Sequence, residues 1–133
     1  MAMRRLKMAD REVDVLVLDD PDLVAAAALE RVVAAAAVHD ATCRAAIERG
    51  LTDEAVALYI RHHLDELPKL AAQLGGDDPE RGFLALLALA TIWVTPDGPR
   101  FHFDYTIDAA ATTYVLSVTL DESGAVTSID MES

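Results

Sequence analysis

The chain has 133 residues, a length that fits one domain with a hydrophobic core of its own. Its composition, 53% hydrophobic and 26% charged, excludes an intrinsically disordered chain. Its net charge of −12 argues against nucleic-acid backbones and anionic membrane surfaces as partners, because both are bound by clustered Lys and Arg. We therefore expect a single α+β domain over residues 1–133 that binds neither nucleic acid nor membranes.

The cysteine content and the start of the chain bear on the compartment. Cys43 has no second cysteine with which to form a disulfide, which suits a reducing cytoplasm. The basic residues in 1–7 are not followed by the apolar segment of a secretory signal. No stretch approaches the roughly 18 apolar residues of a membrane-spanning helix. The sequence thus predicts a cytoplasmic protein.

The first half of the chain predicts a short strand followed by helices. Val13–Leu18 is rich in β-branched residues, so residues 1–18 are expected to form a weak N-terminal strand or arm. Residues 20–75 are expected to be helical, with aspartate–proline and glycine signals at the helix ends. The predicted helices run from Pro21 to about Val38, from Ala41 to Arg49 with Asp40 as the cap, from a Thr52 cap to Leu67 before Pro68, and from Lys69 to Leu74.

Residues 79–133 predict a short helix followed by an antiparallel sheet. Asp78 precedes Pro79, an acidic cap followed by proline at the first helical position. Beyond this helix the hydrophobic period changes to two, as expected of strands with one buried face. The predicted strands are Ala88–Thr95, Arg100–Ile107, Tyr114–Leu120 and Ala125–Glu132, with a turn at Pro96–Pro99 and a hairpin loop at Asp121–Gly124. Val126 is out of phase with Ile129, which indicates either a bulge or a frayed strand start.

The strand face that carries Phe101, Phe103 and Tyr105 requires a cover, because a one-sided sheet must bury its apolar face against another layer. The amphipathic helices before it are the obvious cover. The predicted fold class is therefore α+β, with N-terminal helices packed on one face of a C-terminal four-stranded antiparallel meander. This arrangement leaves room for an extra N-terminal strand.

Two parts of the sequence carry a family resemblance. The motifs are Ala57–Leu67 (ALYIRHHLDEL), Phe103–Asp108 (FDYTID), Thr113–Val118 (TYVLSV) and Ile129–Ser133 (IDMES). They resemble the YI-x-x-H-L-x-E-L helix and the C-terminal FDYTI … MES pattern of a bacterial family of uncharacterised proteins, known only as a domain of unknown function. The resemblance covers roughly residues 20–133, whereas the first 18 residues depart from that family's longer, β-rich start. It implies a shared fold and assigns no activity or catalytic residue.

Histidines and carboxylates on one helix and one strand form a candidate metal site. His62, His63 and Glu66 lie on the third predicted helix, where His62 and Glu66 share a face. His102 and Asp104 share the polar face of a strand. If the two elements meet, these side chains supply a mixed nitrogen and oxygen ligand set. The spacing matches no diagnostic metal motif, so a core position for His63 and surface positions for the other two histidines are the favoured alternative.

Sequence motifs for other kinds of chemistry are missing. The chain has no G-x-S-x-G nucleophile elbow, and Gly75-Gly76 is followed by two aspartates that would repel phosphate. Cys43 lies in an alanine-rich helical stretch, which is typical of a buried thiol. We expect no catalytic residue and no cofactor, and the sequence favours a protein that is not an enzyme.

The outward face of the predicted sheet is a candidate interaction surface. If Ile92 and Val94 point inward, Leu89 and Trp93 point outward toward the neighbouring strands. A half-apolar outer face with a tryptophan is typical of a contact surface. The residues of this candidate surface are Trp93, His102, Asp104, Val115 and Ser117. The alternatives are a cover by another element, or a reversed phase that places Trp93 in the core.

The distribution of charge leaves two interpretations of the C-terminal third. Residues 101–133 contain six acidic residues and no Lys or Arg, whereas four basic residues cluster in the first eleven positions. The acidic end is either a solvated sheet face or a docking surface for a basic partner. We expect a protein partner, and also a homodimer through the sheet edge or its outer face.

Two classes of function follow. The first is a non-catalytic bacterial protein-interaction domain with an acidic surface, comparable by analogy with immunity proteins that neutralise toxins. The alternative is a small metal-binding or metal-assisted hydrolytic protein that uses the histidine and carboxylate cluster. The first requires an accessible acidic face, and the second requires that the third helix and the strand bring their side chains together.

Overall fold

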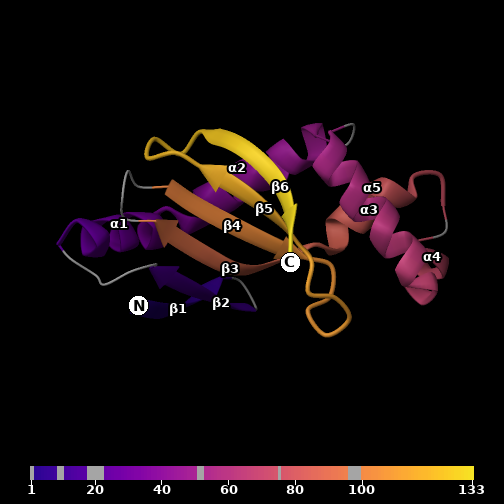
Figure 1. Cartoon of the computed structure of the whole chain (residues 1–133), viewed down its shortest axis with the longest axis horizontal. Helices are drawn as coiled ribbons and strands as arrows, with labels where there is room; N and C mark the ends of the chain where they lie inside the picture. Colours follow the sequence, from indigo (N-terminus) through magenta and orange to yellow (C-terminus); the bar gives the residue numbers. More distant parts are fainter. Residues whose placement is uncertain (1, 9–10, 18–22, 51–52, 75, 96–99) are drawn as a thin grey trace.

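One sheet and a set of helices make up the fold (Figure 1). The computed structural model describes residues 2–8, 11–17, 23–50, 53–74, 76–95 and 100–133. The strands are β1 (Ala2–Met8), β2 (Arg11–Val17), β3 (Ala88–Thr95), β4 (Arg100–Thr106), β5 (Val115–Leu120) and β6 (Val126–Glu132). The helices are α1 (Leu23–Ala34), α2 (Ala36–Arg49), α3 (Glu54–Glu66), α4 (Pro68–Gln73) and α5 (Pro79–Leu86).

The helices α1 and α2 lie along one face of the sheet, and α3, α4 and α5 gather at the end where β3 begins (Figure 1). We call the face that packs against the helices the inner face and the opposite one the outer face. Alternate side chains of β4 point inward, so that Phe101, Phe103 and Tyr105 are 2%, 0% and 0% exposed. They share one core with helical residues such as Tyr59 and Phe83. This burial confirms the predicted packing of the strands after position 100 onto the helices.

The prediction of a four-stranded antiparallel meander was wrong, because the structure forms one mixed sheet of six strands in the order β1-β2-β3-β4-β5-β6. β2 pairs with β3 in parallel, which places Leu16 opposite Trp93 and Val17 opposite Val94. The other neighbouring pairs are antiparallel. Parallel neighbours need a long crossover, and the helical segment between β2 and β3 supplies it. β1 joins the edge of the sheet as the hairpin partner of β2.

Helix boundaries differ from the prediction where the sequence is richest in alanine. The first break falls at Ala35, so Asp40 lies inside α2 and does not cap a helix. The predicted starts at Pro21 and Thr52 lie outside the described residues. Pro68 begins α4 directly after α3, and the Asp78 side chain accepts a hydrogen bond from the backbone N–H of Arg81 at the start of α5. The predicted break at Pro68 and the predicted helix start at Pro79 are confirmed, but α4 includes Pro68 and so begins one residue earlier than expected.

Two irregularities adjust the phase of the strands. Thr119 lies opposite Ser128 and Leu120 opposite Val126, so Thr127 is an extra residue and the predicted irregularity in β6 is a bulge. The register of β3 also shifts between Leu89 and Thr91. Leu89 is therefore 5% exposed and belongs to the core, so its predicted outward position was wrong.

Candidate functional site

The outer face of the sheet carries the five residues of the predicted interaction surface. Trp93 lies opposite His102, and Asp104 lies opposite Ser117 on the next strand. Val115 is two residues from Ser117 on the same strand and therefore shares its face. Ile92 and Val94 are 0% exposed, which confirms that they point inward and Trp93 outward. Among the helices that the structure describes, none crosses this face in Figure 1.

Strand pairing arranges the outer face into two rows that run across the strands. The acidic row consists of Asp14, Thr91, Asp104, Ser117 and Asp130. The aromatic row consists of Leu16, Trp93, His102, Thr119 and Ser128. His102 Nδ1 lies 3.0 Å from the hydroxyl oxygen of Thr119, so a hydrogen bond fixes the ring within its row. Ser117 and Thr119 are only 3% and 7% exposed, so the accessible part of the rows consists mainly of carboxylates beside a half-buried indole, a combination suited to contact with another protein.

Asp104 is the most perturbed carboxyl group on this face. Burial raises its pKa, and the nearby Glu132 carboxylate acts in the same direction. The nearby donor groups of Ser117 and Trp93 and the proximity of His102 oppose this rise. One carboxyl oxygen, Oδ1, is buried without a hydrogen-bond partner among the described residues. Ionised Asp104 is therefore held at a cost in free energy.

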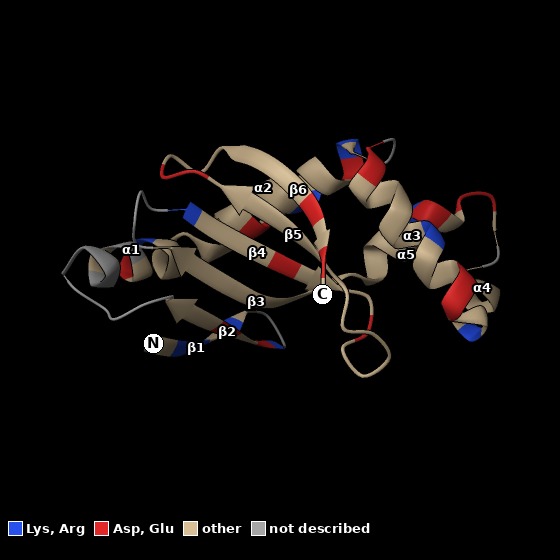
Figure 2. Cartoon of the chain, in the orientation of Figure 1, with Lys and Arg blue, Asp and Glu red and all other residues tan. Residues whose placement is uncertain are grey.

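Charge on the outer face divides between its two halves. Near β1 and β2, Arg5 pairs with Glu12 and Asp14 at 3.5 and 3.2 Å. On β4 and β6, acidic segments lie on the strands, and the only basic segment is at the start of β4 (Figure 2). Asp104 and the exposed acids of β6 are in no ion pair with any residue in the described ranges. This half of the face thus presents carboxylates that no cation of the described chain neutralises.

The helical members of the candidate metal site lie elsewhere. His62, His63 and Glu66 line a cavity of about 360 Å³ together with the loop that precedes β5. His63 is 1% exposed, and its Nδ1 lies 2.7 Å from the carbonyl oxygen of Tyr59. Its Nε2 lies 2.9 Å from the hydroxyl oxygen of Thr112, so both ring nitrogens are engaged within the protein. This geometry is that of a core histidine that ties the loop to α3.

The structure does not bring the two parts of the candidate metal site together. The His63 ring lies beside Phe83 on the helical side of the molecule. His102 and Asp104 lie on the outer face of the sheet, on the opposite side. The described residues contain no group of three or more His, Cys, Asp or Glu side chains arranged to hold a metal ion. Metal coordination by all five residues would require a different arrangement of α3 and β4.

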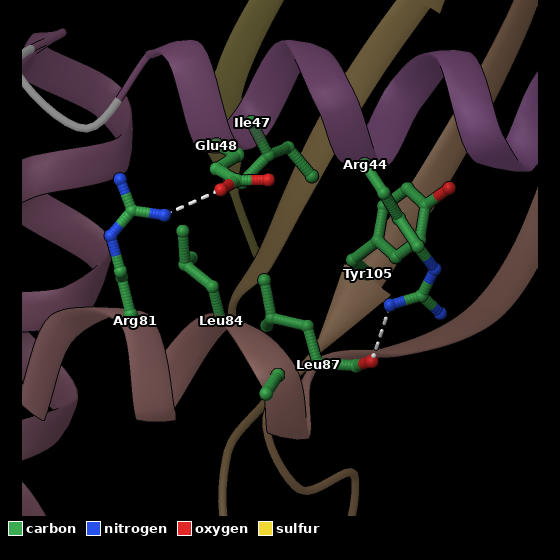
Figure 3. A pocket seen from close by; sticks show the side chains of 8 residues that line it. Arg44, Ile47, Glu48, Arg81, Leu84, Leu87 and Tyr105 are labelled. Carbon is green, nitrogen blue, oxygen red and sulfur yellow. Dashed lines mark hydrogen bonds and ion pairs between the residues drawn. The ribbon is translucent and has the colours of Figure 1, made fainter.

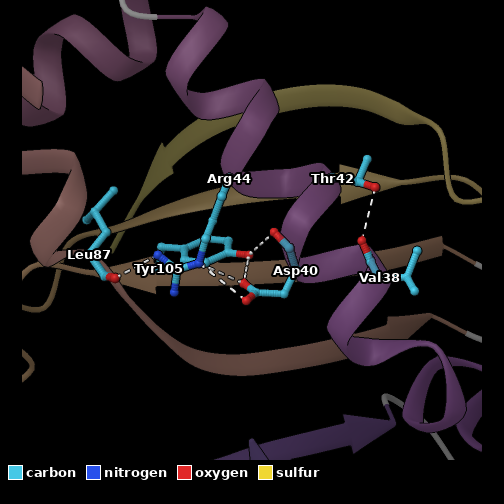
Figure 4. A network of polar contacts seen from close by, with 6 residues as sticks. All are labelled: Val38, Asp40, Thr42, Arg44, Leu87 and Tyr105. Carbon is cyan, nitrogen blue, oxygen red and sulfur yellow. Dashed lines mark hydrogen bonds and ion pairs between the residues drawn. The ribbon is translucent and has the colours of Figure 1, made fainter. Parts of the chain in front are cut away.

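A polar network on the helical side was not identified from the sequence. The Tyr105 hydroxyl donates a hydrogen bond of 2.6 Å to the Asp40 carboxylate (Figure 4). Arg44 Nε donates to the same carboxylate at 3.1 Å, and its Nη1 donates to the carbonyl oxygen of Leu87 at 3.0 Å. The Arg44 guanidinium also lies 5.1 Å from the centre of the Tyr105 ring. The i,i+4 spacing of Asp40 and Arg44 is the one signal in the sequence that pointed to this network.

Arg44 also lines a cavity of about 290 Å³ between α2 and α5 (Figure 3). Arg44 and Arg81 flank Leu84 and Leu87, and Arg81 is 2.5 Å from Glu48 on α2. Cys43 lies in the core beside this network, where burial raises the pKa of its thiol to about 12. A thiol with so high a pKa is not a nucleophile at neutral pH.

Comparison with protein-family models, curated proteins and solved structures gives no match. The resemblance of α3 and the C-terminal strands to the uncharacterised bacterial family therefore stays a prediction. Within the part of the chain that is described, no helix is both long and apolar enough to span a bilayer.

Proposed function

We propose that this protein is an interaction domain that binds a partner protein with a basic surface through the outer face of its sheet. The observation that carries the proposal is the pair of rows on that face, which combine the carboxylates of Asp104 and Asp130 with Trp93. Tryptophan is among the residues that contribute most to binding energy at interfaces. Carboxylates beside it favour a partner that presents Lys or Arg.

The charge of the outer face favours a different protein over a second copy. A dimer formed through this face would bring Asp104, Asp130 and Glu132 of both copies together, and like charges in contact oppose association. The net charge of −12 adds a long-range repulsion between copies. A basic partner gains from the same carboxylates, which also steer its approach.

Charge reversal on the exposed acids of β6 tests the proposal. Asp130→Lys with Glu132→Lys reverses two exposed charges on the outer face, and Asp65→Lys with Asp77→Lys makes the same change on exposed helical and loop positions. Each protein is immobilised and exposed to an extract of the source organism. We expect the wild type and the helical variant to retain the same basic protein, and the β6 variant to lose it.

A direct titration of the captured partner completes the test. Trp93 is the only tryptophan of the chain and lies on the outer face, so partner binding should change its fluorescence. Raising the salt concentration should weaken the complex, because exposed charges are screened. Equal capture by both lysine variants, or an affinity that does not respond to salt, would refute the proposal.

A further inference from the structure

A cavity of about 550 Å³ lies on the helical side of the sheet, between the β1–β2 hairpin and the junction of α1 and α2. Its volume falls within the range of about 300–1,000 Å³ found for small-molecule sites. Apolar side chains from both layers line it: Leu6, Met8, Val13, Val33 and Leu89. On the helical side its wall is made of alanines, whose short side chains leave the space between the layers unfilled. These walls suit an apolar chain.

One exposed cation, Arg11, lines this cavity. Arg11 shares the inner face of β2 with Val13 and is in no ion pair with a described residue. Asp40 and Arg44 also line it, but the Arg44 guanidinium is already bound to the Asp40 carboxylate and to the Leu87 carbonyl. The cation available to a ligand is therefore Arg11. This is notable in a chain whose net charge is −12.

We infer that this cavity binds a small amphiphile with an unbranched apolar chain and a carboxylate head group. The chain lies against Val13, Val33 and Leu89, and the carboxylate accepts hydrogen bonds from the Arg11 guanidinium. A cationic head group would meet Arg11 and be repelled. Because the cavity opens on the helical side, a bound amphiphile leaves the outer face free, and this site acts independently of the proposed partner.

Titration calorimetry with a series of carboxylates tests the inference, with hexanoate, octanoate and decanoate as probes below their micelle concentrations. Each additional methylene buried in the cavity should tighten binding about fourfold. Decyltrimethylammonium, which has the same chain and the opposite charge, should not bind measurably. Absence of decanoate binding, or equal binding of the ammonium compound, would overturn the inference.

Variants locate the site. Ala34→Phe introduces a bulky ring at an exposed position that lines the cavity, and Ala45→Phe makes the same change at an exposed position of α2 that does not line it. Arg11→Gln should weaken decanoate binding about tenfold through loss of a charge-assisted contact, while Arg49→Gln at the far end of α2 should not change it. Retained affinity in Arg11→Gln refutes the inference, whether or not Ala34→Phe folds. Loss in Ala34→Phe and Arg11→Gln but not in their controls, with unchanged Trp93 fluorescence, supports it.

Discussion

The hydrogen bond between Tyr105 and Asp40 joins the inner face of the sheet to α2, and its removal has a predictable cost. Tyr105 is 0% exposed, and its hydroxyl donates to the Asp40 carboxylate at 2.6 Å. A hydrogen bond to a charged group is worth about 1.5–3 kcal/mol. The Asp40 side chain is 22% exposed and keeps its contact with Arg44, so part of the lost bond is recovered from water. We expect Tyr105→Phe to lower the free energy of unfolding by about 2 kcal/mol.

Chemical denaturation followed by circular dichroism measures this cost. For a chain of this length, a loss of about 2 kcal/mol corresponds to a decrease of roughly 7 °C in Tm. Tyr114→Phe removes the same atom from a side chain that is 38% exposed, and should change stability by less than about 0.5 kcal/mol. In a double-mutant cycle, Asp40→Asn and Tyr105→Phe should show a coupling energy of about 1 kcal/mol or more. A Tyr105→Phe variant as stable as Tyr114→Phe would show that the network does not stabilise the fold.

Three further changes have defined outcomes. Asp104→Asn should stabilise the protein by about 1 kcal/mol at pH 7, because the raised pKa of this carboxyl means that its ionised form opposes folding. In urea unfolding this gain should vanish at low pH, where Asp104 is protonated. A loss of stability at pH 7 would contradict the prediction. Burial lowers the pKa of His39 and His63, so their contribution to stability should be fully present above the unfolded pKa of 6.5 and should decrease as the pH falls below it. The free energy of unfolding in urea should therefore differ less between pH 7.5 and 5.5 in His63→Gln than in the wild type. Gly124→Ala should cost about 1–2 kcal/mol, because Gly124 has a φ of +87° and an added Cβ would lie 2.9 Å from His39 Cε1; an unchanged Tm would refute this strain.

The periodicity of two correctly assigned the faces of β4 and β5, because each strand has one face in a continuous core. β1 was missed as a full strand because its inward positions include Arg4, which bonds to Glu30 on α1 and interrupts the apolar alternation. An inward charge of this kind is a known feature of edge strands. The parallel pairing of β2 with β3 has no local signature, since the two strands are separated by all of the helices. The break at Ala35 has none either, because the alanines on both sides of it favour a helix equally.

The candidate surface was accessible to sequence reasoning because its members follow strand alternation, so their common face depends only on strand register. The metal hypothesis required more, namely that α3 approach the outer face. Alternation alone misplaced Leu89 on the outer face. The register of β3 shifts after this residue, so its side chain points to the inner face instead. The cavity behind the β1–β2 hairpin was not predicted because it depends on where α1 and α2 meet the strands. The only sequence feature related to this cavity was the cluster of basic residues in the first eleven positions, which includes Arg11.

The two faces of β4 differ in how their polar groups are satisfied, and this difference links stability to the proposed function. On the inner face, the Tyr105 hydroxyl has a strong acceptor. On the outer face, Asp104 Oδ1 is buried without a partner among the described residues. A core selected only for stability would replace such groups with apolar ones, because isolated polar atoms cost free energy. A cation brought close by a partner would lower the energy of ionised Asp104 through charge alone. The unfavourable free energy of this carboxylate in the free protein is then relieved on binding, which strengthens the complex. Asp104→Asn should therefore stabilise the isolated chain and weaken partner binding, two effects that a purely structural aspartate would not combine.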